Sequence, residues 1–98
     1  MHYIVITRTD ATTDAELGHY LANVGATLEP YQGHLLAFDA PASLEGDTPL
    51  TKTAILAFPT EADAHGWYHS PAYQSLATWR IATMGHPVTI STLPALAA

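Results

Sequence analysis

The segment 67–76 carries the densest set of side chains that could bind a small molecule. It includes the indole of Trp67, the phenols of Tyr68 and Tyr73, and the imidazole of His69. An apolar wall with a few polar groups is typical of a small-molecule pocket, and a buried phenol needs a hydrogen-bond partner that a ligand can provide. We therefore expect these four side chains to contact a substrate. The alternative is that the aromatic rings pack in the core or at a subunit contact.

A guanidinium and a carboxylate are the best candidates for the chemistry itself. Arg80 is the one arginine of the C-terminal half, and Glu45 lies in a loop that follows a predicted strand. At the mouth of a cleft, the two groups could orient a carboxylate or an enol and assist proton transfer. The alternative is a structural ion pair that holds the loop against the helix.

Three histidines need separate interpretations. His34 begins a predicted strand and could be a general base, or it could lie outward or at an interface. His65 and His69 are four residues apart, a spacing that places metal-binding histidines on one helical face. The glutamate of a metalloprotease helix is missing, however, and Ser70-Pro71 interrupts this helix at once. We expect no metal site.

The composition excludes several classes of function. The chain has no cysteine, which rules out thiolate nucleophiles and disulfides. Its formal net charge of −6, with only three Lys and Arg residues, argues against a nucleic-acid partner. There is no phosphate-binding loop, dinucleotide fingerprint or hydrolase serine elbow. No apolar run is long enough for a membrane span, and no signal peptide is evident. We expect a cytoplasmic protein without a tightly bound cofactor.

Two helices are expected to position these residues. Thr13 and Glu16 form a capping box that begins a helix, and this helix ends by Pro30. Thr60 caps a second helix, which Ser70-Pro71 breaks and restarts because serine favours the position before a helix and proline its first turn. Runs rich in β-branched and aromatic residues predict strands at 3–7, 33–39, 53–58 and 86–93.

The resulting order, βαββαβ, predicts an α+β fold of the ferredoxin-like type. Its four-stranded antiparallel sheet would carry both helices on one face. At 98 residues we expect a single domain, 1–98. The second sheet face has no cover, and 48% of the residues are hydrophobic. A homodimer would bury that surplus.

Three segments resemble the DUF1330 family, whose members are small dimeric α+β barrels of ferredoxin-like type. They are Leu44-Glu45-Gly46-Asp47, Phe58-Pro59-Thr60 and 67–76. The resemblance covers nearly the whole chain and implies that a second subunit covers the open sheet face. It names no activity, because the family has no assigned function. It places family-typical residues at several candidate positions, among them Glu45, Tyr68, Tyr73 and Arg80.

The first functional hypothesis is a small cofactor-independent enzyme of the cyclase, isomerase or monooxygenase type. It would act on a hydrophobic, oxygenated small molecule by proton transfer in the helix–sheet cleft, and specialised-metabolite biosynthesis is the expected setting. Glu45 or His34 would move the proton, and Arg80 with a phenol would hold the oxygen that gains charge. The second hypothesis is a non-catalytic dimeric binding or stress-response module. A third is a haem-handling barrel with a histidine as axial ligand. The sequence names neither substrate nor reaction.

Overall fold

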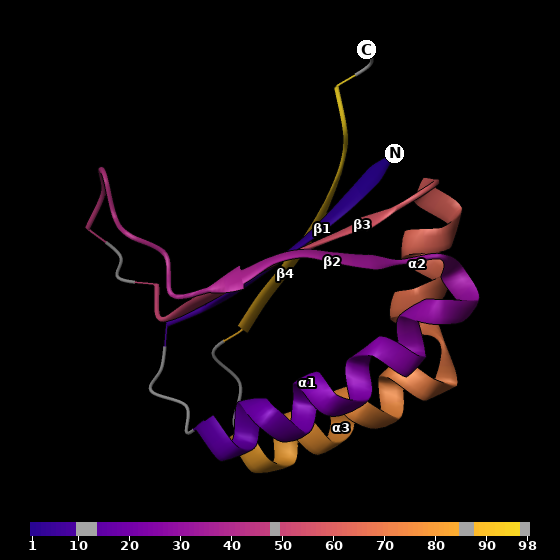
Figure 1. The fold of residues 1–98 in the computed structure, drawn as a ribbon, viewed down its shortest axis with the longest axis horizontal. Helices are drawn as coiled ribbons and strands as arrows, with labels where there is room; N and C mark the ends of the chain where they lie inside the picture. The colour runs from indigo at the N-terminus through magenta and orange to yellow at the C-terminus, as the bar shows by residue number, and fades with distance from the viewer. Residues whose placement is uncertain (10–13, 48–49, 85–87, 97–98) are drawn as a thin grey trace.

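The computed structural model describes residues 1–9, 14–47, 50–84 and 88–96, and Figure 1 shows their arrangement. The elements follow in this order: β1 (His2–Arg8), α1 (Asp14–Leu28), a short 3₁₀ turn η1 (Glu29–Tyr31), β2 (His34–Asp39), β3 (Lys52–Phe58), α2 (Glu61–His69), α3 (Pro71–Met84) and β4 (Val88–Pro94). The predicted order βαββαβ is confirmed. Thr13 of the predicted capping box and the predicted start of the last strand at His86 lie outside the described residues.

All four strands form one antiparallel sheet with the order β2-β3-β1-β4. The central strand β1 pairs with β3 on one side and with β4 on the other. The helices lie together on one side of this sheet, and α1 runs beside α3 (Figure 1). The predicted α+β, ferredoxin-like fold is therefore confirmed. In the described part of the chain, no helix is long and apolar enough to cross a membrane.

The break between α2 and α3 lies where the sequence predicts it. Ser70 has an extended backbone (φ −64°, ψ 145°), so α2 ends there. Its hydroxyl accepts a hydrogen bond from the Tyr73 N–H at 3.2 Å and donates one to the Trp67 carbonyl at 2.7 Å. Serine thus caps both helices, and this cap fixes the direction in which α3 presents Tyr73.

The core lies between the helices and the sheet. Its largest fully buried side chains are Trp67, Tyr73, Phe58 and Leu56. The indole Nε1 of Trp67 donates to the Thr27 hydroxyl at 2.9 Å, so its buried N–H is satisfied. Gly33 contributes through its small size, because a Cβ there would lie 2.6 Å from Cε1 of Phe58.

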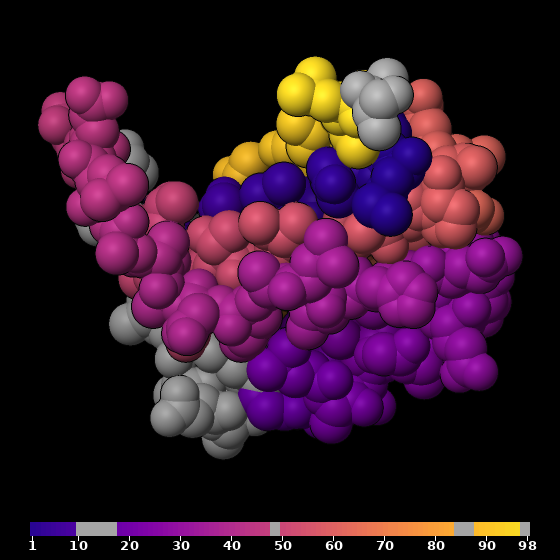
Figure 2. Space-filling model, turned by 45° about the horizontal axis from the view of Figure 1, so that its top comes forward, coloured from indigo at the N-terminus to yellow at the C-terminus, as the bar shows by residue number. Residues whose placement is uncertain are grey.

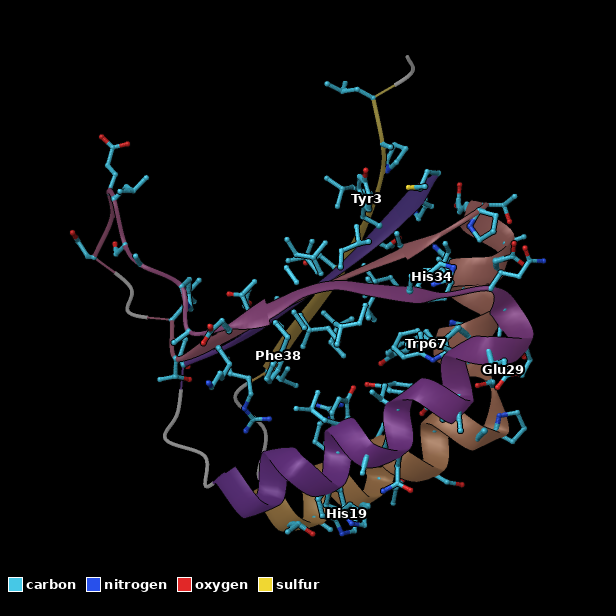
Figure 3. The ribbon with its side chains drawn as sticks, in the orientation of Figure 1. Tyr3, His19, Glu29, His34, Phe38 and Trp67 are labelled. Atoms are coloured by element: carbon cyan, nitrogen blue, oxygen red, sulfur yellow. The ribbon has the colours of Figure 1, made fainter. Side chains whose placement is uncertain are left out.

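Successive side chains of each strand point to opposite sides of the sheet. On β1, Ile4 faces the helices and is buried, whereas Tyr3 and Val5 face the other side and are partly exposed. Figure 3 shows Tyr3 on the side away from the helices, and Phe38 and Trp67 between sheet and helices. We call the side without helices the open face. No described helix covers it (Figure 1).

Candidate functional site

A cavity of about 40 Å³ lies between the helix side of the sheet and helices α1 and α3. We call it the arginine cleft. All four strands and both helices contribute to its wall. The described residues that line it are Ile6, Arg8, Tyr20, Leu21, Val24, Leu35, Phe38, Lys52, Ala54, Leu56, Arg80 and Val88. Eight of these twelve side chains are apolar, so the few polar groups are the features that could orient a ligand.

Arg80 is the most unusual side chain of this cleft. It lies on the same face of α3 as Tyr73, as the helical spacing predicts, and it is only 5% exposed. Its Nε and Nη1 atoms have no hydrogen-bond partner among the described residues. A buried charge without full hydrogen bonding lowers the free energy of unfolding. Such a group is expected where a ligand completes the hydrogen bonds.

Two phenols lie beside Arg80. The hydroxyl oxygens of Tyr20 and Tyr73 are 3.0 Å apart and share a hydrogen bond. Burial raises the pKa of Tyr20, and the neighbouring Tyr73 raises it further. Burial also raises the pKa of Tyr73, while the hydrogen bond with Tyr20 and the charge of Arg80 act in the opposite direction. Both phenols are therefore protonated at neutral pH and can donate hydrogen bonds.

Two further cations lie at the end of the cleft formed by β1 and β3. The strand register places Arg8 directly opposite Lys52, and both side chains line the cleft. Arg8 is 5% exposed. The Nζ atom of Lys52 lies 3.9 Å from Oδ1 of Asp39, whose side chain is 89% exposed. The β1–β3 register thus brings a second arginine and a lysine to the same end of the cleft.

A second cavity, of about 240 Å³, lies between α2 and strands β1 and β4. Two of the predicted substrate-binding residues, Tyr68 and His69, line it together with His65. The ring of Tyr68 lies 5.8 Å from the ring of Tyr73. The predicted binding residues of 67–76 are thus divided, because Tyr68 and His69 border this cavity while Tyr73 contacts the arginine cleft through Tyr20.

Trp67 and Tyr73 occupy the core rather than a pocket wall. Both are 0% exposed, and their rings are 4.1 Å apart. Neither is among the described residues that line the two cavities. For Trp67 the structure supports the packing alternative. Tyr73 acts as a positioning residue, through its hydrogen bonds with Tyr20 and Arg80.

The structure does not bring Glu45 or His34 to Arg80. Glu45 is exposed in the described part of the β2–β3 loop, 40–47, which projects from the body of the molecule (Figure 2). His34 is exposed and lies opposite Ala57, on the open face, because its neighbour Leu35 lines the cleft on the helix side. The expectation that these groups meet Arg80 in one cleft is therefore corrected for the single chain. Strand alternation separates His34, and the direction of the loop separates Glu45.

Sequence reasoning missed Arg8, Lys52 and Tyr20. The scarcity of permanent cations was the available signal, since the chain has only three Lys and Arg residues. Arg8 and Lys52 are adjacent because of the β1–β3 register, and no local sequence pattern predicts that register. The described residues contain no group of three or more His, Cys, Asp or Glu that could hold a metal ion.

The comparison with protein families decides the membership of the chain. The model of DUF1330, a domain of unknown function, matches residues 2–91. The chain belongs to the DUF1330 family. The sequence matches no curated protein.

Solved structures share the fold of this DUF1330 protein at low sequence identity. It is similar to the crystal structure of At3g17210 from Arabidopsis thaliana, with a TM-score of 0.75, 15% identity, and coverage of 100% of this chain and 98% of that chain. It is also similar to SnoaB, a cofactor-independent oxygenase from Streptomyces nogalater, with a TM-score of 0.68, 14% identity, and coverage of 99% and 94%. A third neighbour is a dimeric ferredoxin-like protein of unknown function from Jannaschia sp. CCS1, with a TM-score of 0.65, 12% identity, and coverage of 96% and 98%.

Proposed function

We propose that this DUF1330 protein is a small cofactor-independent enzyme that converts an apolar, oxygenated small molecule through its enolate in the arginine cleft. The observation that carries the proposal is the buried guanidinium of Arg80, whose Nε and Nη1 lack partners among the described residues and which lies beside the Tyr20–Tyr73 pair. A preorganised charge of this kind stabilises an oxygen that gains negative charge.

The proposed enolate formation follows from the positive charges that line the arginine cleft. Buried cations lower the pKa of a bound carbon acid, because its enolate gains an opposite charge at short range in a poorly solvated cleft. The described lining contains no carboxylate and no imidazole. In this proposal water takes the proton, the positive charge of Arg80 stabilises the enolate oxygen, and the protonated phenol of Tyr20 donates a hydrogen bond to that oxygen. Tyr73 keeps the Tyr20 hydroxyl in place.

Among the structural neighbours, SnoaB is a cofactor-independent oxygenase, which supports chemistry without a cofactor on this fold. Fold similarity at this identity does not carry over an activity. The proposal therefore covers the common step, enolate formation, from which isomerisation, cyclisation or oxygenation can follow. A role in specialised metabolism would fit any of these outcomes.

Proton exchange tests the proposal without knowledge of the natural substrate. Apolar aromatic ketones and phenols with an acidic C–H are incubated with the protein in D₂O, and loss of the C–H signal is followed by NMR while an electrode follows oxygen. At least one compound should exchange faster than in buffer. Arg80→Met should then reduce the rate by about 10²–10³, the usual effect of losing one oxyanion donor. His34→Ala, on the open face, is the control and should retain the rate. Exchange that Arg80→Met leaves unchanged would contradict the proposal.

The second candidate function is a dimeric binding module that uses the same cleft without turnover. It is favoured by one observation, the absence of a carboxylate or imidazole from the described lining of the cleft. The exchange experiment separates the two functions, because a module would bind a compound without accelerating its exchange.

We also propose that the protein is a homodimer joined through its open faces. The described structural neighbour from Jannaschia sp. CCS1 is dimeric. The open face of this chain carries partly exposed apolar residues, among them Tyr3, Val5 and Ile55, and no described helix covers them. Burial of such a face against a second copy removes apolar surface from water. Light scattering should give twice the chain mass of 10.5 kDa, and a monomer at micromolar concentration would contradict this assembly.

A further inference from the structure

The permanent cations of this chain all meet at one place. The sequence has three Lys and Arg residues and a formal net charge of −6. All three residues, Arg8, Lys52 and Arg80, line the arginine cleft. None of the described lining residues is acidic. The protein is acidic overall, so its surface as a whole repels anions. A cavity that is lined by all three of its cations is therefore the place where an anion would bind.

The position of Arg80 is unfavourable for the fold alone. Arg80 is 5% exposed and has two nitrogens without a hydrogen-bond partner among the described residues. Arg8 and Lys52 lie directly opposite each other across β1 and β3, and both line the same cleft. Asp39 lies 3.9 Å from Lys52 with an 89% exposed side chain, so it offsets that charge weakly. An anion bound in the cleft would complete the hydrogen bonds of Arg80 and lie near the charges of Lys52 and Arg8.

The rest of the wall defines what kind of anion fits. The other lining side chains are the phenol of Tyr20 and eight apolar groups from the strands and α1. Inorganic anions keep much of their hydration and gain nothing from apolar contact. An organic acid can place its charged oxygens against the cations and part of its hydrocarbon against the apolar wall, while the rest of the molecule lies outside the enclosed volume of about 40 Å³.

We propose that the natural ligand of the arginine cleft is an apolar organic anion that carries a carboxylate. The carboxylate accepts hydrogen bonds from the free Nε and Nη1 atoms of Arg80, and Lys52 and Arg8 add their charge. The inference rests on the proposed function, because it names the substrate class of the same cleft. In that reaction, the carboxylate holds the substrate while a second oxygen, beside Tyr20, gains the enolate charge.

Matched pairs of small ligands test the inference. The probes are butyrate and hexanoate, their neutral amides, and inorganic phosphate, and dissociation constants are measured by NMR titration of the full chain. Each acid should bind at least about 10-fold more tightly than its amide, the scale of a charge-assisted hydrogen bond. Hexanoate should bind more tightly than butyrate, by up to about fourfold for each added methylene that is buried. Phosphate should bind more weakly than hexanoate.

Three variants locate the binding. Arg80→Met should weaken hexanoate binding at least about 10-fold and leave hexanamide binding nearly unchanged. Lys52→Met, at a partly exposed position where misfolding is a smaller risk, should weaken it in the same direction by a smaller factor. Ala72→Glu changes the net charge by the same unit on the exposed surface of α3 and is the matched control. It should leave hexanoate affinity within about twofold, because an exposed charge outside the cleft is screened.

Each outcome has a defined meaning. Equal affinity for acids and amides, or loss of hexanoate affinity in Ala72→Glu equal to that in Arg80→Met, would overturn the inference. Phosphate binding as tight as hexanoate would overturn the organic part of it. Selective binding of hexanoate without any proton exchange in the panel of ketones would support the inference and leave the enzyme proposal to fail on its own. Proton exchange that occurs only with neutral compounds, together with no preference for acids over amides, would support the enzyme proposal and overturn the inference.

Discussion

The two faces of the sheet are built from the same four strands but differ in what covers their apolar side chains and in where the cations lie. On the helix side, the chain covers its own apolar residues and then places three cations among them. On the open face, apolar side chains such as Val5 and Ile55 have no cover from a described helix. On the helix side, the Nε and Nη1 atoms of Arg80 thus lack a hydrogen-bond partner among the described residues. On the open face, the apolar side chains lack a described helix above them. The comparison leads to the two proposals made above, that a ligand completes the helix side and a second subunit covers the open face.

The largest expected effect comes from the core that supports the helix side. Trp67→Ala should lower the free energy of unfolding by about 3–5 kcal/mol, because it leaves a cavity at a fully buried site. Urea unfolding followed by circular dichroism measures the change. Thr27→Val is the smaller companion change and should lower it by about 1–3 kcal/mol, since the Trp67 N–H loses its acceptor. A Trp67→Ala variant of wild-type stability would show that this ring is not core.

The next largest effect should appear on the open face. Ile55→Glu places a charge in the proposed subunit contact and should raise the dimer dissociation constant by at least about 100-fold, the scale of a central interface residue. Analytical ultracentrifugation measures the constant. The monomer should remain folded, because Ile55 lies outside the buried core cluster. Ala72→Glu adds the same charge on the helix side and should leave the dimer intact. A dimer that tolerates Ile55→Glu would place the contact elsewhere.

The fold was largely predictable because its signals are local. Thr60 caps α2, Ser70 ends it, and Arg80 shares a face with Tyr73 at helical spacing. Each of these depends on neighbours within a few turns of the chain. The ferredoxin-like sheet then follows from the order of the elements.

The site was predictable only in part because its other members meet through long-range geometry. Arg8 and Lys52 are brought together by the β1–β3 register, a property of the assembled sheet. The open-face position of His34 depends on which residue of β2 pairs with Ala57. No periodicity constrains the β2–β3 loop, so the direction of the segment that carries Glu45 could not be derived from its composition.

The helix side should also respond to alkaline pH. Because the folded-state pKa values of Tyr20 and Tyr73 are raised above the ordinary value of 10.0, both phenols stay protonated in the folded chain while the unfolded chain ionises. Their contribution to stability is complete below pH 10 and is lost as the pH rises above it. The free energy of unfolding should fall by about 1.4 kcal/mol for each pH unit above 10 for each phenol that stays protonated in the folded chain. Tyr20→Phe should fall less steeply in the same urea titrations, and an equal slope would contradict the burial of this phenol.

The direction in which Arg80→Met changes the free energy of unfolding is informative. Removal of a buried charge whose Nε and Nη1 lack partners among the described residues should leave the free energy of unfolding unchanged or raise it, by up to about 4 kcal/mol. Thermal unfolding without ligand measures this. A fall of more than about 2 kcal/mol would assign Arg80 a structural role, since breaking a satisfied buried interaction is destabilising.

The smallest effects are expected from the two predicted residues that lie away from the cleft. Glu45→Gln and His34→Ala should each change hexanoate affinity by less than about twofold, because both side chains are exposed and outside the described lining. Titrations on the dimer are the relevant measurement, since a partner could bring either residue to the cleft. A tenfold loss in Glu45→Gln would restore its predicted role through the second subunit.

The arginine side chains report most directly on whether the helix side of the sheet is completed by a ligand. The chain has two arginines, Arg8 and Arg80, so a ¹⁵N NMR spectrum of the Nε–H groups contains two signals, and the Arg80→Met spectrum assigns them. On addition of hexanoate, the Arg80 signal should shift and sharpen as Nε gains an acceptor, while hexanamide should leave it in place. If saturating hexanoate moves neither signal, or if its effects fall on residues of the open face, then Arg80 is not a ligand-binding group and the account of the helix side is wrong.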